Sequence, residues 1–215
     1  MTLKLYSHPL SSFCQKVLIA LYENGTPFEA KMVNFGDEAS RSEFVSVWPM
    51  AKIPVLVDGK RDQVVPETSI IIEYLDQHYP GRCRLIAADP DLARQTRLRD
   101  RFFDLYVHMQ MQKIVGDRLR PEDKRDLFGV AEARRLLSTA LELIDESMAG
   151  KEWAMGEDFT MADCAAAPAL WYANEAQPFA DTHPNTFDYL ERLKARPSFS
   201  RALREAEPYL HLFPR

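Results

Sequence analysis

The chain has 215 residues, 46% of them hydrophobic, and a formal net charge of −5. A chain of this length and composition can bury one or two hydrophobic cores, and its acidic balance disfavours nucleic acid as a partner. The three cysteines (Cys14, Cys83 and Cys164) are too widely and irregularly spaced for a disulfide framework or a metal site. This pattern predicts a reducing compartment.

Two further observations concern targeting and membranes. The amino terminus lacks the charged and then apolar segment of a signal peptide. The longest apolar run, from Cys164 to Ala173, is interrupted by Pro168 and is too short to span a bilayer. We therefore expect a cytoplasmic protein without a membrane partner.

The first predicted elements are a strand and a helix on either side of Ser11-Ser12-Phe13-Cys14. Leu3 and Leu5 indicate the strand, and the apolar residues among 17–21 indicate the helix. At this junction thioredoxin-like folds keep a redox C-x-x-C. Ser11 in its first position excludes dithiol chemistry and leaves a hydroxyl that can donate to a thiol brought by a ligand. The alternative is that Ser11 or Ser12 merely caps the helix.

The elements that follow complete a small α/β unit. The sequence predicts a strand over 28–33, an irregular helical stretch over 38–47, and a hairpin whose Asp58-Gly59 pair makes the turn. Pro66-Glu67-Thr68-Ser69 then opens another helix. In this order the elements form a right-handed βαβ unit joined to a ββα unit. Pro54, at the mouth of the first hairpin strand, is a candidate for a cis peptide bond.

Every periodic segment beyond residue 80 is helical. The boundary falls near 80–83 and the linker ends at Pro90, which gives predicted domains of 1–80 and 88–215. One long helix carries apolar residues four, three and four positions apart, at Leu98, Phe102, Leu105 and Met109. A second helix shows the same kind of face and ends near Gly150; its apolar residues are Leu137, Leu141, Ile144 and Met148.

A capping box marks the start of the next helix. In Thr160-Met161-Ala162-Asp163 an Asp replaces the usual Glu, and the helix is expected to run to Ala176. Shorter helices are predicted over 186–194 and 198–205. The expected fold class is an α/β thioredoxin-like amino-terminal domain followed by an all-α carboxy-terminal domain.

Three motifs agree in order and spacing: Ser11-x-x-Cys14 after the first strand, Lys52-Ile53-Pro54 before the third, and Glu67-Thr68 at the third helix. Together they resemble the cytosolic glutathione S-transferase family, in particular bacterial Ser-type members near the theta, zeta and delta classes. The resemblance covers the whole length, because the remainder is similar to the helical second domain of that family. It implies a homodimer that conjugates glutathione, as co-substrate, to a small electrophile without a metal.

The resemblance also implies roles for individual residues. Ser11 would hydrogen-bond the sulfur of glutathione, and the positive end of the helix would add to the stabilisation of the thiolate. The backbone of Ile53 would pair with the cysteinyl unit, and Lys52 would meet the glycyl carboxylate. Glu67 would bind the ammonium of the γ-glutamyl end, and Thr68 would bind its carboxylate.

Simpler interpretations exist for several of these residues. Thr68 and Ser69 could cap the third helix. Glu67 could be a first-turn acid that interacts favourably with the helix dipole, and Lys52 could be a solvated loop charge. Tyr6 is the rival of Ser11, because other classes of the family use a tyrosine from the end of the first strand. Its place between two strand residues also suits simple packing.

The reaction and its second substrate are less defined. Zeta enzymes, which isomerise maleylacetoacetate, carry a cysteine directly after the paired serines; here that residue is Phe13, and Cys14 is expected to be buried and inert. Members that reduce disulfides or dehydroascorbate need a cysteine where this chain has Ser11. Conjugation is therefore the expected reaction. The electrophile would lie among Leu10, Tyr106 and Met109, with Trp171 a weaker candidate.

A basic stripe on the long helix suggests a different kind of partner. Arg94, Arg97 and Arg101 share one helix face. The net charge and the interleaved aspartates argue against nucleic acid. We expect a solvated helix face or part of a subunit interface; in the interface, the stripe would meet acids such as Glu73 or Asp76 on the partner's third helix. A second alternative is a binding protein of the same fold in a transcription or translation complex; the complete motif set favours the enzyme.

Overall fold

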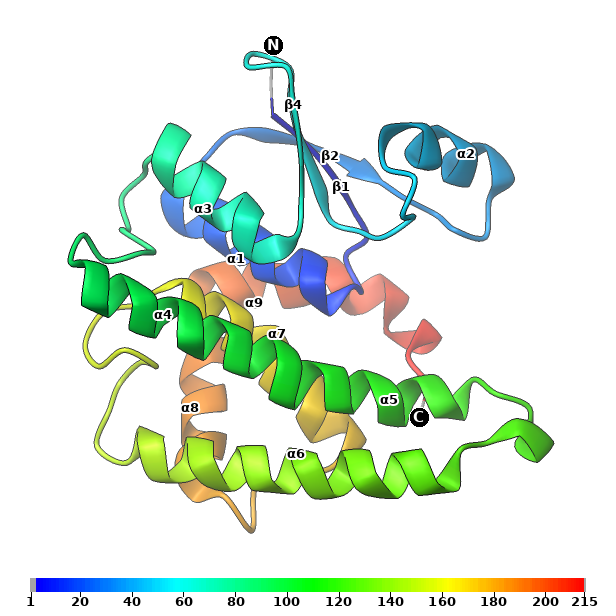
Figure 1. Cartoon of the computed structure of the whole chain (residues 1–215), viewed down its shortest axis with the longest axis vertical. Helices are drawn as coiled ribbons and strands as arrows, with labels where there is room; N and C mark the ends of the chain where they lie inside the picture. Colours follow the sequence, from blue (N-terminus) through cyan, green and yellow to red (C-terminus); the bar gives the residue numbers. More distant parts are fainter. Residues whose placement is uncertain (1–2, 215) are drawn as a thin grey trace.

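The first part of the chain is an α/β unit (Figure 1). The computed structural model describes residues 3–214, so Met1 and Thr2 of the predicted strand start lie outside the described residues. The elements of this unit are β1 (Leu3–Ser7), α1 (Ser12–Asn24), β2 (Phe28–Met32), α2 (Glu38–Val47), β3 (Val55–Asp58), β4 (Gln63–Pro66) and α3 (Thr68–His78).

The four strands form one mixed sheet in the order β2-β1-β3-β4. β1 pairs in parallel with β2 and antiparallel with β3, so that Leu5 lies opposite both Ala30 and Leu56. α1 and α3 cover one face, where Leu5, Val17 and Ile71 are buried together. α2 covers the other face, where Phe44 is buried with Val33 and Val55. The predicted thioredoxin-like arrangement is confirmed.

The hairpin between β3 and β4 differs from the prediction. Asp58 is the last residue of β3 and pairs with Gln63, so the loop comprises four residues, 59–62, and not an Asp58-Gly59 turn. The buried Asp58 carboxylate accepts hydrogen bonds from the backbone N–H groups of Lys60 (2.9 Å) and Arg61 (3.3 Å). The side chain of Asp58 therefore organises the loop. The residue with a positive φ, of 54°, is Asp62 at the end of the loop.

The second part of the chain is helical. Its elements are α4 (Pro90–Phe102), the π-helical segment η1 (Phe103–His108), α5 (Met109–Arg118), the 3₁₀ turn η2 (Glu122–Lys124), α6 (Leu127–Met148), α7 (Met161–Ala176), α8 (Pro184–Ala195), α9 (Pro197–Ala206) and the 3₁₀ segment η3 (Glu207–Leu212). In Figure 1, α4, η1 and α5 form one long rod, and α6 runs back alongside it. The helix expected to end near Gly150 is α6, and the one expected over 161–176 is α7.

The apolar face predicted for the long helix is largely exposed, and a different face of this helix is buried. Leu98, Leu105 and Met109 are 64%, 47% and 47% exposed, whereas the neighbouring series Phe103, Val107, Met111 and Ile114 is buried. The same face is buried before η1, because Ala93, Thr96 and Asp100 of α4 are buried while Leu98 between them is exposed. The core face is therefore spaced by four, four and three residues.

The predicted capping box of α7 is confirmed and lies in the core. The fully buried Asp163 carboxylate accepts hydrogen bonds from the backbone N–H groups of Thr160 and Ala154, both at 2.8 Å, and from the Tyr189 hydroxyl at 2.6 Å. This residue thereby ties α7 to α8 and to the preceding loop. Its role is structural, as predicted.

The α/β unit packs on the helical part through α1, which contacts α7 and α9. Glu23 near the end of α1 accepts two hydrogen bonds from the Arg196 guanidinium, at 2.7 and 2.8 Å. Between residues 3 and 214, no helix combines the length and the apolarity needed to cross a bilayer.

Candidate functional site

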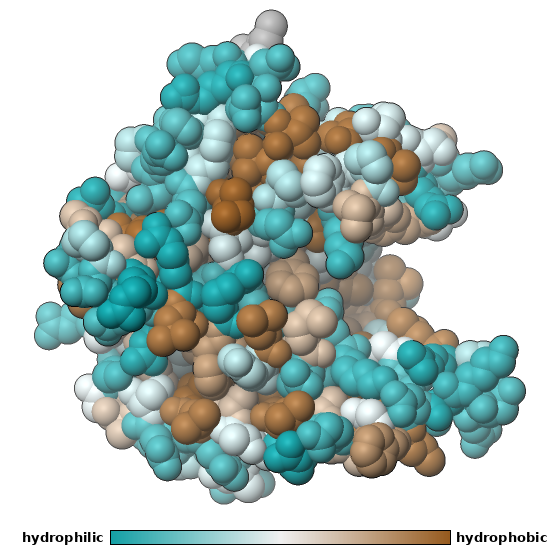
Figure 2. Space-filling view, in the orientation of Figure 1, coloured by the Kyte–Doolittle hydropathy of each residue, from teal (hydrophilic) through white to brown (hydrophobic). Residues whose placement is uncertain are grey.

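A cavity of about 480 Å³ opens between the α/β unit and the η1–α5 rod. Figure 2 shows the surface hollowed on this side, with apolar side chains inside the hollow. Five residues singled out for glutathione line the cavity together, although they are far apart in the sequence: Ser11, Lys52, Ile53, Glu67 and Thr68. Their convergence makes this cavity the candidate site.

Ser11 is the N-cap residue of α1 and lies at the cavity wall. Its Oγ accepts a long hydrogen bond of 3.4 Å from the Cys14 N–H, and its own N–H donates to the His8 carbonyl at 2.9 Å. The capping interpretation is therefore correct for Ser11. It does not exclude a second role, because the hydroxyl proton is free to donate towards the cavity.

The other candidates near Ser11 are directed elsewhere. Ser12 is buried, and its Oγ lies 2.7 Å from Nε2 of His108. Cys14 is fully buried, and burial raises the pKa of its thiol to about 12, which agrees with the prediction that it is inert. Among the described residues that line the cavity, Tyr6 is absent; its ring packs against Phe44 of α2 with centroids 5.7 Å apart.

The segment before β3 exposes backbone to the cavity. The Ile53-Pro54 peptide bond is cis, as predicted. The β3 ladder begins at Val55, opposite Tyr6, so Ile53 lies beyond the paired part of the strand. Ala51, which also lines the cavity, has a φ of 52°. An unpaired extended backbone beside a cis proline can bind another peptide segment.

The start of α3 forms another part of the wall. Glu67 is the N-cap residue with a φ of 68°, a conformation that costs free energy in a residue other than glycine and is common at binding sites. Within residues 3–214 its side chain makes no capping hydrogen bond. Thr68 is the first residue of the helix and is 6% exposed. The alternative in which Thr68 and Ser69 cap α3 is thus wrong, since Glu67 has that position.

Positive charge lies at two places around the cavity. Lys52 is exposed at its rim, and Arg101 reaches it from α4. One guanidinium nitrogen of Arg101 lies 2.9 Å from the Asp104 carboxylate and 3.3 Å from the Ser69 hydroxyl. Two helix amino termini, those of α1 and α3, add partial positive charge. The cavity is therefore suited to a ligand that carries carboxylates at separated positions.

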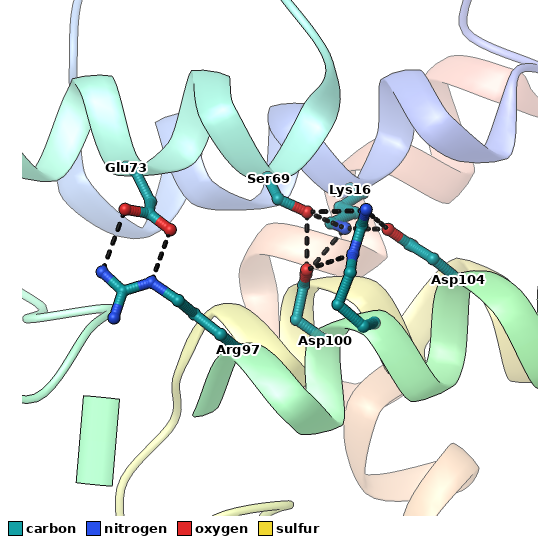
Figure 3. Close-up of polar contacts among 7 residues, drawn as sticks. Lys16, Ser69, Glu73, Arg97, Asp100 and Asp104 are labelled. Carbon is teal, nitrogen blue, oxygen red and sulfur yellow. Dashed lines mark hydrogen bonds and ion pairs between the residues drawn. The ribbon is translucent and has the colours of Figure 1, made fainter. Parts of the chain in front are cut away.

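A buried cluster of charges next to the cavity joins α1, α3 and the rod (Figure 3). Nζ of Lys16 lies 2.6 Å from Asp100 and 2.7 Å from Asp104, and all three side chains are at most 5% exposed. Burial raises the pKa of Asp100, an effect that Lys16 opposes. Ser69 donates to Asp100 and accepts from Lys16 at 3.1 Å. Breaking such a cluster leaves a buried charge unpaired, so these residues fix the rod relative to the α/β unit.

The basic stripe is paired within the chain, which corrects its expected partner. Nε and Nη2 of Arg97 donate to Glu73 at 2.7 and 2.9 Å in a bidentate pair between α4 and α3 (Figure 3). Arg94 is paired with Asp91 of its own helix at 3.2 Å. Glu73 is therefore already engaged and does not need a second subunit.

The remaining wall is apolar. Phe13, Phe35 and Trp48 contribute from the α/β unit, and Leu105 and Met109 contribute from the rod, with Gln112 at one edge. Met109 was expected here. Leu10 and Tyr106 are missing from the lining that residues 3–214 provide.

Leu10 and Tyr106 have identifiable positions elsewhere. The Leu10 carbonyl accepts a hydrogen bond from the Tyr172 hydroxyl, and its side chain packs on the larger core. Tyr106 is 53% exposed and lies beside Phe102, with ring centroids 5.2 Å apart. Trp171 packs edge-on against Tyr172.

Comparison with known proteins gives consistent matches over the whole chain. The family profile described as Glutathione S-transferase, N-terminal domain, matches residues 5–83, and the profile of the C-terminal domain matches 106–197. Glutathione S-transferase Z2 of Arabidopsis thaliana is 32% identical over 96% of this chain and 92% of its own length. A probable maleylacetoacetate isomerase of Caenorhabditis elegans is 31% identical over 95% and 94%. The crystal structure of a glutathione S-transferase from Methylobacterium radiotolerans, in complex with glutathione sulfonate, superposes with a TM-score of 0.81 at 30% identity, covering 94% of each chain.

Proposed function

The chain belongs to the glutathione S-transferase family, and we propose that it conjugates the thiolate of glutathione to a small, apolar electrophile. One observation carries the proposal. Ser11, the cis Ile53-Pro54 unit and the Glu67-Thr68 helix start, which lie on three separate segments, line one cavity with an apolar opposite wall. We further propose 1–80 as the glutathione-binding domain and 88–215 as the helical domain.

Recognition would use both ends of the tripeptide. The γ-glutamyl carboxylate would accept hydrogen bonds from the backbone N–H and the hydroxyl of Thr68, with its ammonium at Glu67. The cysteinyl unit would pair with the backbone of Ile53 as a one-residue strand addition. Lys52 at the rim would meet the glycyl carboxylate. Half-exposed Arg101, which the sequence analysis assigned to a surface stripe, lines the same cavity as Thr68 and would share the γ-glutamyl carboxylate.

Ser11 would activate the thiol. A free thiol has a pKa near 8.5, and lowering it by about two units corresponds to about 2.7 kcal/mol of preference for the thiolate. The Ser11 hydroxyl would supply part of this preference by donating to the charged sulfur, and the amino terminus of α1 would supply more. Deprotonated at neutral pH, the sulfur can attack an electrophile held against Phe13, Leu105 and Met109.

The test is an assay of the purified protein with glutathione and chlorodinitrobenzene, a general electrophile. We expect conjugate to form faster than in the uncatalysed reaction. The relationship to a maleylacetoacetate isomerase supports isomerisation as a second candidate. Conversion of maleylacetoacetate without conjugation of any electrophile in a panel would favour the isomerase.

A binding protein without catalysis is the remaining alternative. Retention on immobilised glutathione, together with conjugation in solution, supports the enzyme. Retention without turnover of any substrate in the panel would favour the binding protein. A reducing cytoplasm, rich in glutathione, suits a chain whose described cysteines are all free. Removal of toxic electrophiles would be its role there.

We also propose a homodimer, supported by an apolar groove between α4 and α6. Leu98, Phe102 and Leu143 line this groove, and Leu98 and Leu143 are 64% and 51% exposed. Figure 2 shows apolar surface over these two helices. Apolar side chains gathered on two adjacent helices commonly mark an interface.

Because apolar contacts are not screened by salt, we expect light scattering to give about twice 24.7 kDa both at low salt and at about 0.5 M. A monomer at low salt would contradict the dimer. Dissociation at high salt alone would mean that ion pairs hold it.

A further inference from the structure

His108, the last residue of η1, contacts the helix start that carries Ser11. The residue is 1% exposed although it belongs to the helical part of the chain. Its Nε2 lies 2.7 Å from Oγ of Ser12. Its ring stacks on the ring of Phe13, with centroids 3.9 Å apart and planes inclined by 24°.

These two contacts hold the residues directly after Ser11. Ser12 and Phe13 are the first two residues of α1, and Ser11 is its cap. On the other side, the Ser11 N–H is held by the His8 carbonyl at 2.9 Å. The direction of the Ser11 hydroxyl therefore depends on a turn that is fixed from the α/β unit before it and from His108 after it.

His108 reaches this turn from the buried face of the rod. Asp100, Asp104 and His108 follow one another at intervals of four residues, and all three are buried. The two aspartates lie within 2.7 Å of Lys16 of α1, and His108 lies 2.7 Å from Ser12 at the start of the same helix. One face of the rod therefore contacts α1 along its length, and His108 is its contact at the helix start.

The chemical state of the ring suits a fixed contact. Burial lowers the pKa of His108 to about 4, the facing Asp104 raises it, and Lys16 of α1 lowers it. The ring is therefore neutral near physiological pH. A neutral imidazole can accept from the Ser12 hydroxyl or donate to it, and either arrangement engages the hydroxyl of Ser12 and leaves that of Ser11 for the ligand.

We propose that His108 is a positioning residue for thiol activation: through Ser12 and Phe13 it orients the turn from which Ser11 donates to the glutathione sulfur. This inference rests on the proposed function. It assigns a positioning role to a residue that lies outside the cavity lining and is not expected to touch glutathione or the electrophile. Its effect should therefore appear in the reactivity of the sulfur and hardly in the binding of glutathione.

The test compares Ser12→Ala, which removes one hydroxyl, with His108→Phe, which keeps a ring to stack on Phe13. For each variant the thiol of bound glutathione is titrated by the ultraviolet absorbance of its thiolate. We expect its pKa to rise by about one unit and kcat near neutral pH to fall about threefold, because a rise from about 6.5 to about 7.5 lowers the thiolate fraction at pH 7 from about three quarters to about one quarter. Calorimetry should give a nearly unchanged Kd for glutathione.

The double variant tests whether both residues act through one contact. Its pKa shift should not exceed that of His108→Phe, because the hydrogen bond can be lost only once. His211→Phe, at an exposed histidine of η3, is the matched control and should behave like the wild type. If His108→Phe fails to fold, the thiol pKa measured in Ser12→Ala alone tests the inference.

Variants that fold and conjugate with the wild-type thiol pKa would overturn the inference and leave the proposed function intact. Fully additive shifts would also overturn it. A wild-type protein that binds no glutathione would overturn the proposed function, and the inference with it.

Discussion

The wall of the cavity formed by residues 11–68 depends on backbone geometry, whereas the wall formed by residues 101–112 depends on which side of a helical rod its side chains occupy. On the first wall, a cap, a cis peptide bond and a positive φ at Glu67 direct backbone groups at the cavity. On the second, Leu105 and Met109 offer only apolar surface. We infer that the first wall, together with Arg101 at the start of the second, binds the common substrate, and that Leu105 and Met109 select the electrophile.

The largest effect should come from Ser11, whose hydroxyl lies on the wall formed by residues 11–68 and acts on the reacting sulfur. Ser11→Ala should slow conjugation by roughly 10²-fold and leave the affinity for glutathione within a few-fold, since the hydroxyl acts chiefly on the thiolate. Steady-state kinetics and calorimetry measure the two quantities. Tyr6→Phe is the control and should retain full rate. The reverse result would mean that the wrong hydroxyl has been chosen.

Thr68→Val tests whether the wall formed by residues 11–68 recognises glutathione. The change removes a hydroxyl while preserving shape, so the γ-glutamyl carboxylate should lose a partner and binding should weaken by about 1 to 3 kcal/mol. Calorimetric titration with glutathione measures this directly. Thr139→Val, on the exposed side of α6, is the matched control. An unchanged Kd in Thr68→Val would return this residue to a purely structural role.

The smallest effects should fall on the other wall. Leu105 and Met109 are each 47% exposed, so truncation to Ala removes only part of the value of a buried side chain. We expect KM for the electrophile to rise about three- to tenfold. The Kd for glutathione should stay constant, as it should in the control Leu119→Ala, whose side chain is 72% exposed. A change in glutathione affinity would break the proposed division of labour.

The same division explains what the sequence could predict. Caps, X-Pro bonds and helix starts are local features that marked Ser11, Ile53-Pro54 and Thr68, and the family resemblance then assigned these residues their roles. The positive φ of Ala51 and Glu67 was missed, because neither residue type signals such a conformation. Both residues line the cavity, so their backbone conformation depends on tertiary contacts that the sequence does not display.

The helical wall was harder to predict because its apolar residues surround the rod. The series of Leu98 and the series of Phe103 both fit a helical period, and nothing in the sequence marked which of the two faces is buried. Leu105 was therefore assigned to the core face. Arg101 was assigned to a surface stripe, although it lies at the cavity.

The role of Ser11 is tested most directly by a crystal structure of the protein with glutathione, from which the distance between the sulfur and each nearby hydroxyl is measured. We predict hydrogen-bond distance between the sulfur and Oγ of Ser11, with the cysteinyl backbone at Ile53 and the γ-glutamyl carboxylate at Thr68. A sulfur bound instead to the hydroxyl of Tyr6, or glutathione bound outside this cavity, would contradict it.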